Sequence, residues 1–169
     1  MKILLILIIF IACCATPSET KTPPPPEKTT LKKAPPVDSE RVFFSNISGK
    51  KVSAKELSNG KPVVFHITAS WCEPCKELAK RLNELREHYY VGKIEFFSVY
   101  KKGDSPLAED VVFPCYYFEN SFPELSLEDM DIFPRLLVFN EDGALTALID
   151  GLYPTLYYYA VFEEIAGDK

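Results

Sequence analysis

The clearest pattern of hydrophobic and polar positions lies between residues 61 and 100. The stretch 61–70, KPVVFHITAS, is a short apolar run with β-branched residues, which predicts a buried strand. Residues 76–90 predict an amphipathic helix whose apolar stripe carries Leu78, Leu82, Leu85 and Tyr89. Residues 93–100, KIEFFSVY, predict a second strand. A strand, a helix and a strand in this order form a βαβ unit, so we expect these two strands to be parallel.

The pattern changes after residue 100. Residues 101–132 contain three prolines, a glycine, several acidic residues and Cys115, and we expect short helices and loops there. Residues 135–139 and 144–150 predict two strands, and the Asn-Glu-Asp-Gly turn between them predicts a β-hairpin. Residues 154–166 predict a closing helix, with a proline at its start and Gly167 after its end.

The N-terminal segment differs in kind from the rest. Lys2 precedes an unbroken apolar run that ends at Ala15, shorter than the ~20 residues of a membrane-spanning helix and typical of a secretory signal. The sequence FIAC, residues 10–13, also resembles a bacterial lipobox, which implies lipidation of Cys13. Phe10 stands where a lipobox usually has leucine. Because Cys14 directly follows Cys13, the sequence does not decide before which cysteine the leader is cleaved. We therefore predict a signal or lipoprotein leader over 1–15, with an ordinary signal peptide as the alternative.

Residues 16–40 are rich in proline, threonine, lysine and glutamate and carry almost no large apolar side chain. Such a segment cannot bury enough surface to offset its ordering entropy, and its prolines favour an extended chain. We interpret it as a disordered tether between the leader and one folded domain over 41–169. The leader and the tether together predict a protein of the cell envelope, exported or held at the membrane by a lipid anchor.

Composition and charge exclude several kinds of site. The net charge of −5 argues against a nucleic-acid surface. A zinc site needs four ligands, usually from two cysteine pairs, whereas the predicted domain has one close pair and only the histidines His66 and His88. We expect no metal and no cofactor.

The close pair, Cys72 and Cys75, stands where the first predicted strand passes into the helix. A helix N-terminus stabilises a thiolate, so Cys72 is the candidate attacking thiol and Cys75 the candidate resolving thiol. Pro74 is compatible with a first helical turn, and the charge of Glu73 disfavours the Cys72 thiolate. A purely structural disulfide would gain little from closing so short a loop.

The sequence ASWCEPCKEL, which includes Trp71, resembles the active site of thioredoxin-like thiol–disulfide oxidoreductases of the bacterial cell envelope, of the TlpA/ResA type. The resemblance covers residues 43–167 and implies an α/β fold with a central mixed sheet flanked by helices. It implies a reductase of protein disulfides, for example in cytochrome c maturation, with apocytochrome c or misoxidised envelope proteins as partners and a membrane-embedded electron donor. It also implies a cis proline facing the cysteines.

Three Phe-Pro steps compete for that position, at Pro114, Pro123 and Pro134. Only Phe133-Pro134 immediately precedes a predicted strand and hairpin, so we assign the cis bond there, with a trans proline at a strand start as the alternative.

Two residues keep alternative roles. His66 stands where the family often has a buried aspartate that moves the proton of the second cysteine; it is either such a proton carrier or a hydrogen-bonded core histidine. Cys115 is either a third redox thiol or a buried inert one. Two other functions also stay open: a non-catalytic binding module that uses the groove beside Cys72 and Pro134, and a copper-handling protein.

Overall fold

The computed structural model describes residues 37, 39–106, 112–118 and 132–167. The predictions for the leader, Cys13, Cys14 and the tether up to residue 36 lie outside these residues. The end of the predicted tether is wrong as a disordered segment, because Val37 and Ser39 are buried and the Ser39 N–H donates to the Gly143 carbonyl at 3.1 Å.

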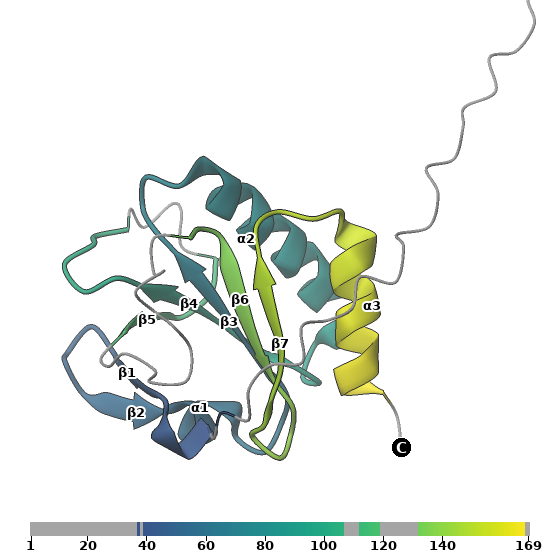
Figure 1. Cartoon of the computed structure of the whole chain (residues 1–169), viewed down its shortest axis with the longest axis horizontal. Coiled ribbons are helices and arrows are strands. Elements are labelled where there is room, and N and C mark those ends of the chain that lie inside the picture. The colour runs from purple at the N-terminus through teal and green to yellow at the C-terminus, as the bar shows by residue number, and fades with distance from the viewer. Residues whose placement is uncertain (1–36, 38, 107–111, 119–131, 168–169) are drawn as a thin grey trace, which may run out of the picture.

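The described residues form one mixed sheet of seven strands in the order β2-β1-β5-β4-β3-β6-β7 (Figure 1). Strands β3 and β4 are parallel and form the predicted βαβ unit, and β6 and β7 form the predicted antiparallel hairpin. The strand bounds are Phe43–Ser45 for β1, Lys51–Ser53 for β2, Val63–Thr68 for β3, Glu95–Tyr100 for β4, Cys115–Phe118 for β5, Arg135–Phe139 for β6 and Leu145–Asp150 for β7.

The expectation of only short helices and loops over 101–132 is wrong at one place. Cys115–Phe118 forms β5, which pairs parallel with β4 and antiparallel with β1. The segment CYYF has the aromatic composition of a strand, but it has no alternation of polar and apolar residues, and a proline precedes it. Its strand character therefore depends on partners from distant parts of the chain. Residues 107–111 and 119–131 of this region lie outside the described residues.

Helices cover both faces of the sheet. A short helix, α1 (Ala54–Ser58), begins with a capping box in which Ser53 and Glu56 exchange side-chain to backbone hydrogen bonds. Helix α2 (Glu73–Leu85) begins directly after Cys72, with Pro74 in its first turn as predicted, and α3 (Thr155–Ala166) has Pro154 and Gly167 as its two caps. A single 3-10 turn, η1 (Ser39–Arg41), precedes β1.

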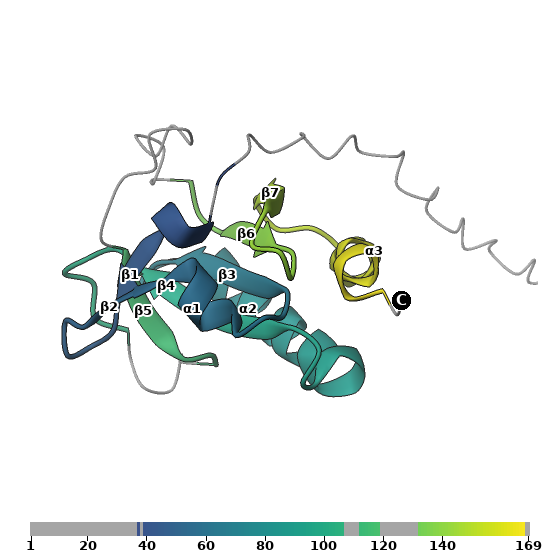
Figure 2. The same cartoon turned by 90° about the horizontal axis from the view of Figure 1, so that it is seen from below.

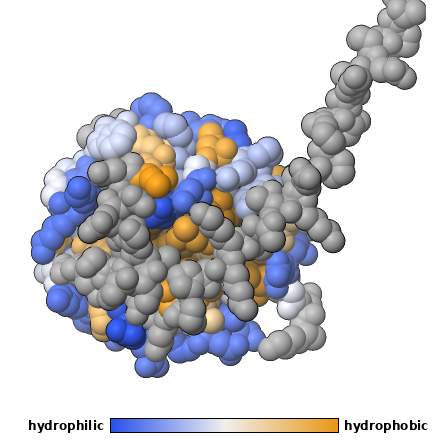
Figure 3. All heavy atoms as spheres, in the orientation of Figure 1, coloured by the Kyte–Doolittle hydropathy of each residue, from blue (hydrophilic) through white to orange (hydrophobic). Residues whose placement is uncertain are grey.

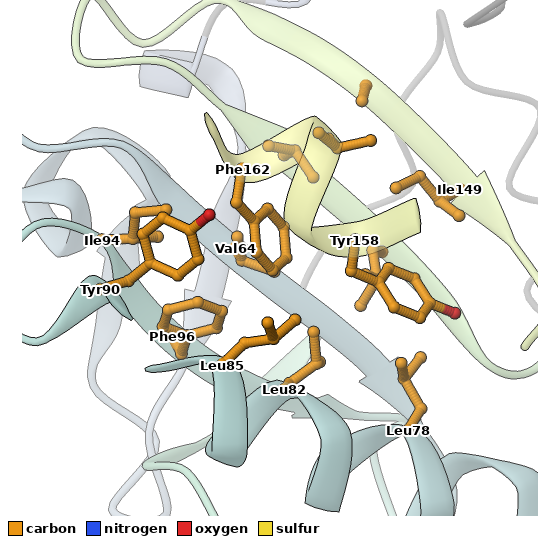
Figure 4. Packing of buried hydrophobic residues seen from close by; sticks show 14 of the residues in the cluster. Val64, Leu78, Leu82, Leu85, Tyr90, Ile94, Phe96, Ile149, Tyr158 and Phe162 are labelled. Atoms are coloured by element: carbon orange, nitrogen blue, oxygen red, sulfur yellow. The ribbon is translucent and has the colours of Figure 1, made fainter. Parts of the chain in front are cut away.

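The apolar stripe of α2 is confirmed for its leucines but wrong for its last member. Leu78, Leu82 and Leu85 are buried, whereas Tyr89 is 56% exposed and Tyr90 is 1% exposed. The cause is a π-helical turn, η2 (Arg86–Tyr90), which continues α2 with a wider repeat. The extra residue moves the inward position from 89 to 90, and Figure 4 shows the Tyr90 ring beside Phe96 and Phe162.

Two hydrophobic clusters lie on opposite faces of the sheet. One contains Phe44, Phe65 and Leu137 and packs against α1. The other joins the sheet to α2 and α3 through Leu78, Leu82, Val64, Tyr158 and Phe162 (Figure 4). Each fully buried side chain of this size contributes about 1.5–3 kcal/mol, so α2 is fixed on the sheet along its length. In the view of Figure 3 the described outer surface is mainly hydrophilic, with separate hydrophobic patches.

Candidate redox site

Cys72 and Cys75 lie at the junction of β3 and α2, as the sequence predicts. Their sulfur atoms form a disulfide with an S–S distance of 2.03 Å. Cys72 is the N-cap of α2, and the backbone N–H of Cys75 donates to the Cys72 Sγ at 3.3 Å. Pro74 occupies the first helical turn, where it interrupts no helical hydrogen bond. Both sulfur-bearing residues are nearly inaccessible, at 3% and 0% exposed.

The loop before β6 forms the second side of the site. The Phe133–Pro134 peptide bond is cis, as the resemblance implies. Phe133 packs against a small cluster made of Ala69 and the two cysteines. The backbone N–H of Gly151 donates to the Pro134 carbonyl at 2.7 Å, which joins this loop to the end of β7.

Arg135, directly after the cis proline, is 5% exposed. Its guanidinium donates to both carboxylate oxygens of Asp150, at 2.5 and 3.2 Å. This bidentate pair and the Gly151 hydrogen bond attach residues 134–135 firmly to β7. The sequence analysis did not identify the pair, because Arg135 stands within an otherwise apolar strand segment.

Trp71 is 71% exposed, in contrast to the two buried cysteines. Its ring meets that of Phe133 edge to face, with centroids 5.6 Å apart. The loop before α2 and the loop before β6 are therefore in direct aromatic contact, and an apolar surface lies beside the disulfide.

Glu73 is exposed at the start of α2, and Lys76 Nζ lies 3.2 Å from its carboxylate. From the sequence alone the charge of Glu73 appears unopposed, since no basic residue stands between the cysteines. The structure shows that Lys76, just after Cys75, compensates part of this charge by its i,i+3 position on the helix.

His66 lies on the sheet face that α2 covers, because it stands two residues after Val64, which belongs to the cluster on that face, and residues two apart in a strand share a face. It is 2% exposed, and neither ring nitrogen has a hydrogen-bond partner among the described protein atoms. Burial lowers the pKa of the imidazole to about 3, so the ring is neutral around neutral pH while the disulfide is intact. Both roles of His66, proton carrier and core histidine, stay predictions.

Asp104, in the loop after β4, was missed by the sequence analysis. Its carboxylate accepts from the Ser70 backbone N–H at 2.8 Å and from the Ser70 hydroxyl. Burial alone would raise the pKa of Asp104, but the hydrogen bonds from Ser70 and from the Ser105 backbone outweigh it and lower the pKa. Asp104 thus fixes the turn two residues before Cys72. No local sequence motif predicts this contact, because 34 positions separate Ser70 from Asp104.

Cys115 lies on β5, two strands away from His66 in the sheet order. It is half-buried and has a free thiol, and burial raises its pKa. These observations fit the inert thiol better than a third redox partner.

Within the described ranges, no group of three or more histidine, cysteine, aspartate or glutamate side chains lies close enough together to hold a metal ion. None of the described helices has the length and apolar character needed to cross a membrane.

Comparisons with known proteins agree with this architecture. The sequence model of the family described as Thioredoxin matches residues 47–118, which include both cysteines. A thioredoxin-like protein HCF164 from chloroplasts of Oryza sativa subsp. japonica is 38% identical over 56 residues, covering 30% of this chain and 21% of that protein. A chloroplastic M-type thioredoxin of Brassica napus is 37% identical over 71 residues, covering 42% of this chain and 36% of that protein. The chain thus spans between a fifth and two fifths of the length of these relatives.

Solved structures match over a larger share of the chain. A thiol:disulfide interchange protein from Bacteroides sp. has a TM-score of 0.60 at 17% identity, covering 81% of this chain and 93% of that one. A thiol:disulfide interchange protein of the thioredoxin family from Chlorobium tepidum has a TM-score of 0.55 at 17% identity, covering 80% and 99%. The mixed sheet flanked by helices, the cysteine pair at the start of α2 and these matches lead to one conclusion: the described part of the chain has the thioredoxin fold.

Proposed function

We propose that this chain is a thiol–disulfide oxidoreductase of the cell envelope that reduces disulfides in proteins. One observation supports this proposal above the others: Cys72 caps the N-terminus of α2, with the Cys75 N–H directed at its sulfur and Phe133 packed against both residues. A thiolate at this position is stabilised by the helix dipole and by a backbone donor, and a thiolate is the nucleophile in disulfide exchange.

The reaction begins from the dithiol form. The Cys72 thiolate attacks one sulfur of the substrate disulfide, so a mixed disulfide forms and one substrate thiolate leaves. Cys75, once deprotonated, attacks the Cys72 sulfur and releases the second substrate thiolate. The substrate gains two electrons and, once its thiolates are protonated, two protons. The protein loses the same number and returns to the Cys72–Cys75 disulfide.

His66 is the proposed acceptor of the Cys75 proton. The ring is neutral and lies on the sheet face that α2 covers, and its nitrogens have no partner among the protein atoms that the structure describes. A thiolate that develops near this buried ring would favour its protonated form and raise its pKa during the reaction. Cys75 is fully buried, so a proton acceptor inside the protein avoids bringing water to the sulfur.

The location and the partners are proposed from the sequence. The leader over 1–15 and the tether over 16–40 favour an exported protein held at the membrane through Cys13. Solved proteins of this fold carry the name thiol:disulfide interchange protein, which favours disulfide-containing proteins as substrates. Apocytochrome c is one substrate of this kind. A reductase in an oxidising compartment needs continuous reduction, hence a membrane-embedded electron donor.

The test is to express Cys75→Ser in the organism that carries the chain and to identify proteins that stay disulfide-linked to Cys72. Without the resolving thiol, the mixed disulfide should accumulate. Cys72→Ser is the matched negative control, and Cys115→Ser should leave the trapped set unchanged.

Two results would contradict the proposal. A purified dithiol that fails to reduce any small or protein disulfide would favour the binding-module alternative. Stoichiometric, tight Cu(I) binding by Cys72 and Cys75, with no exchange activity, would favour the copper-handling alternative.

A further inference from the structure

The proline loop, residues 132–134, forms one side of the redox site, and strand β7 holds it from behind. Phe133 packs against the cluster that contains both cysteines. Directly after the loop, Arg135 stands opposite Asp150 in the antiparallel register of β6 and β7. The residues that hold this loop therefore also determine how its apolar side chains lie beside the disulfide.

Arg135 is an unusual residue for its place in β6. The following residues of the strand, 136–139, are apolar, and Arg135 is buried like them. A guanidinium stays charged in proteins, so at this depth it needs a partner. The Asp150 carboxylate accepts from two nitrogens of the guanidinium, an arrangement that fixes both side chains. Because a well-packed apolar residue could often replace such a pair without loss of stability, packing alone does not explain the arginine.

The backbone beside this pair is held as well. Gly151, directly after Asp150, donates its N–H to the Pro134 carbonyl at 2.7 Å. The φ of Gly151 is +95°, a conformation in which a residue with a side chain would be strained. A side-chain pair and a backbone hydrogen bond thus join two consecutive residues, 134 and 135, to two consecutive residues at the end of β7.

The segment after β7 is in turn fixed to α2 and α3. The hydroxyl of Tyr158 in α3 donates to the Gly151 carbonyl at 3.3 Å and accepts from the Tyr153 N–H at 2.8 Å. Arg81 of α2 donates to the Tyr153 carbonyl at 2.8 Å. Figures 1 and 2 both show α3 beside the hairpin of β6 and β7. The proline loop is therefore supported by residues that lie outside the cysteine cluster.

We propose that Arg135 is a positioning residue for protein substrates: through Asp150, it holds the proline loop where the loop receives the chain beside a substrate disulfide. This assignment rests on the proposed function, and it adds the residue pair that favours protein disulfides over small ones. A protein substrate contacts the loop as well as Cys72, so it gains from a loop that is already in place. A small disulfide needs only the thiolate.

The experiment measures single turnovers of the reduced full chain with two disulfides. One is a synthetic peptide closed by an internal disulfide, and the other is bis(2-hydroxyethyl) disulfide. The reaction is stopped with acid, the remaining thiols are alkylated, and the fraction of oxidised chain is measured by mass. Varying the peptide concentration gives the half-saturating concentration and the limiting rate separately.

Two variants weaken the support of the loop. Asp150→Asn replaces the partner of Arg135 by a neutral side chain of the same shape, and Tyr158→Phe removes only a hydroxyl. For both we expect the half-saturating peptide concentration to rise about fivefold or more. The limiting rate and the rate with the small disulfide should change about twofold at most, because Cys72 itself is unaltered.

Glu95→Gln is the matched control. It breaks the ion pair of Glu95 with Lys61, whose atoms lie 2.7 Å apart. Because β3 and β4 are parallel and Glu95 is the first residue of β4, this pair lies at the end of the sheet opposite to the cysteines. Glu95→Gln should therefore keep the half-saturating concentration of the wild type.

An unchanged half-saturating concentration in either folded variant would overturn the inference, and so would an equal rise in Glu95→Gln. An equally large loss with the small disulfide would overturn it too, because the variants would then act on Cys72. If Asp150→Asn does not fold, Tyr158→Phe decides alone, since its ring still fills the core. Failure of the wild type with both disulfides would instead refute the proposed function, and this inference with it.

Discussion

The rings of Trp71 and Phe133 meet edge to face across the two loops that border the disulfide, with centroids 5.6 Å apart. One ring precedes Cys72 in the chain and the other precedes the cis proline. The contact thus ties the cysteine loop to the proline loop at the protein surface, where the indole is mostly exposed.

Phe133→Ala should therefore release the indole. An aromatic pair of this geometry contributes about 0.5–1.5 kcal/mol, so we expect a loss of stability of about 1 kcal/mol or somewhat more. Tryptophan emission should shift to longer wavelength, and its anisotropy should fall. Leu156→Ala, which truncates an exposed side chain of α3, is the control. Unchanged anisotropy in Phe133→Ala would show that the ring contact does not restrain Trp71.

Glu73→Gln and Lys76→Gln should have opposite effects on Cys72. The first removes a negative charge beside the thiolate, so a larger share of Cys72 should be ionised at a given pH and the couple should become more oxidising. The second removes the compensating positive charge and should do the reverse. Both shifts should be small, because the ion pair is exposed. Alkylation rates and equilibration with dithiothreitol buffers measure them; shifts of the same sign would contradict the argument.

The wild-type couple itself should be reducing. Glu73 opposes the helix dipole next to Cys72, and Lys76 offsets this opposition only partly. We expect a midpoint nearer thioredoxin, at about −270 mV, than the oxidant DsbA, at about −120 mV. A midpoint near the DsbA value would overturn the reductase assignment while leaving the exchange chemistry intact.

His66 should make folding stability depend on pH. Its pKa is about 3 in the folded protein and about 6.5 when exposed by unfolding. Between these values the unfolded chain binds the extra proton, so stability falls as pH decreases, by at most about 1.4 kcal/mol per pH unit. His66→Asn should lack this contribution. Denaturation curves of both proteins between pH 7 and about 3 test it; parallel pH profiles would contradict the neutral buried ring.

The same variant tests the proposed proton transfer. If His66 accepts the Cys75 proton, His66→Asn should slow resolution of the mixed disulfide by about 10²-fold or more, while attack by Cys72 stays nearly unchanged. Stopped-flow measurement of the two phases separates them. Equal resolution rates at every pH would leave His66 as a packing residue.

The sequence predicted the parts of the fold that local pattern determines. The apolar run of β3, the stripe of α2 and the turn of the β6–β7 hairpin each carry their signal within a few residues. The cysteine pair was also identified from its place between a strand and a helix. The cis proline was expected from the family resemblance, and its place before a predicted strand assigned it to Pro134.

Other parts depend on contacts between distant residues and carry no local signal. Strand β5 exists because β4 and β1 flank it, and Asp104 reaches Ser70 across 34 positions. The Glu73–Lys76 ion pair could have been predicted from its i,i+3 spacing in a helix. The burial of His66 without a hydrogen-bond partner among the described atoms could not, because it depends on which distant residues pack around the ring.

The π-helical turn after α2 has a consequence for sequence alignment. Arg86–Tyr90 holds one residue more than a regular helical repeat needs between Leu85 and the next inward side chain. A homologous chain lacking one residue here could close the gap as ordinary α-helix and still direct an aromatic ring toward Phe96 and Phe162. Alignments of related sequences should therefore place a one-residue gap within 86–90, whereas a gap within 73–85 would rotate the leucines away from the sheet.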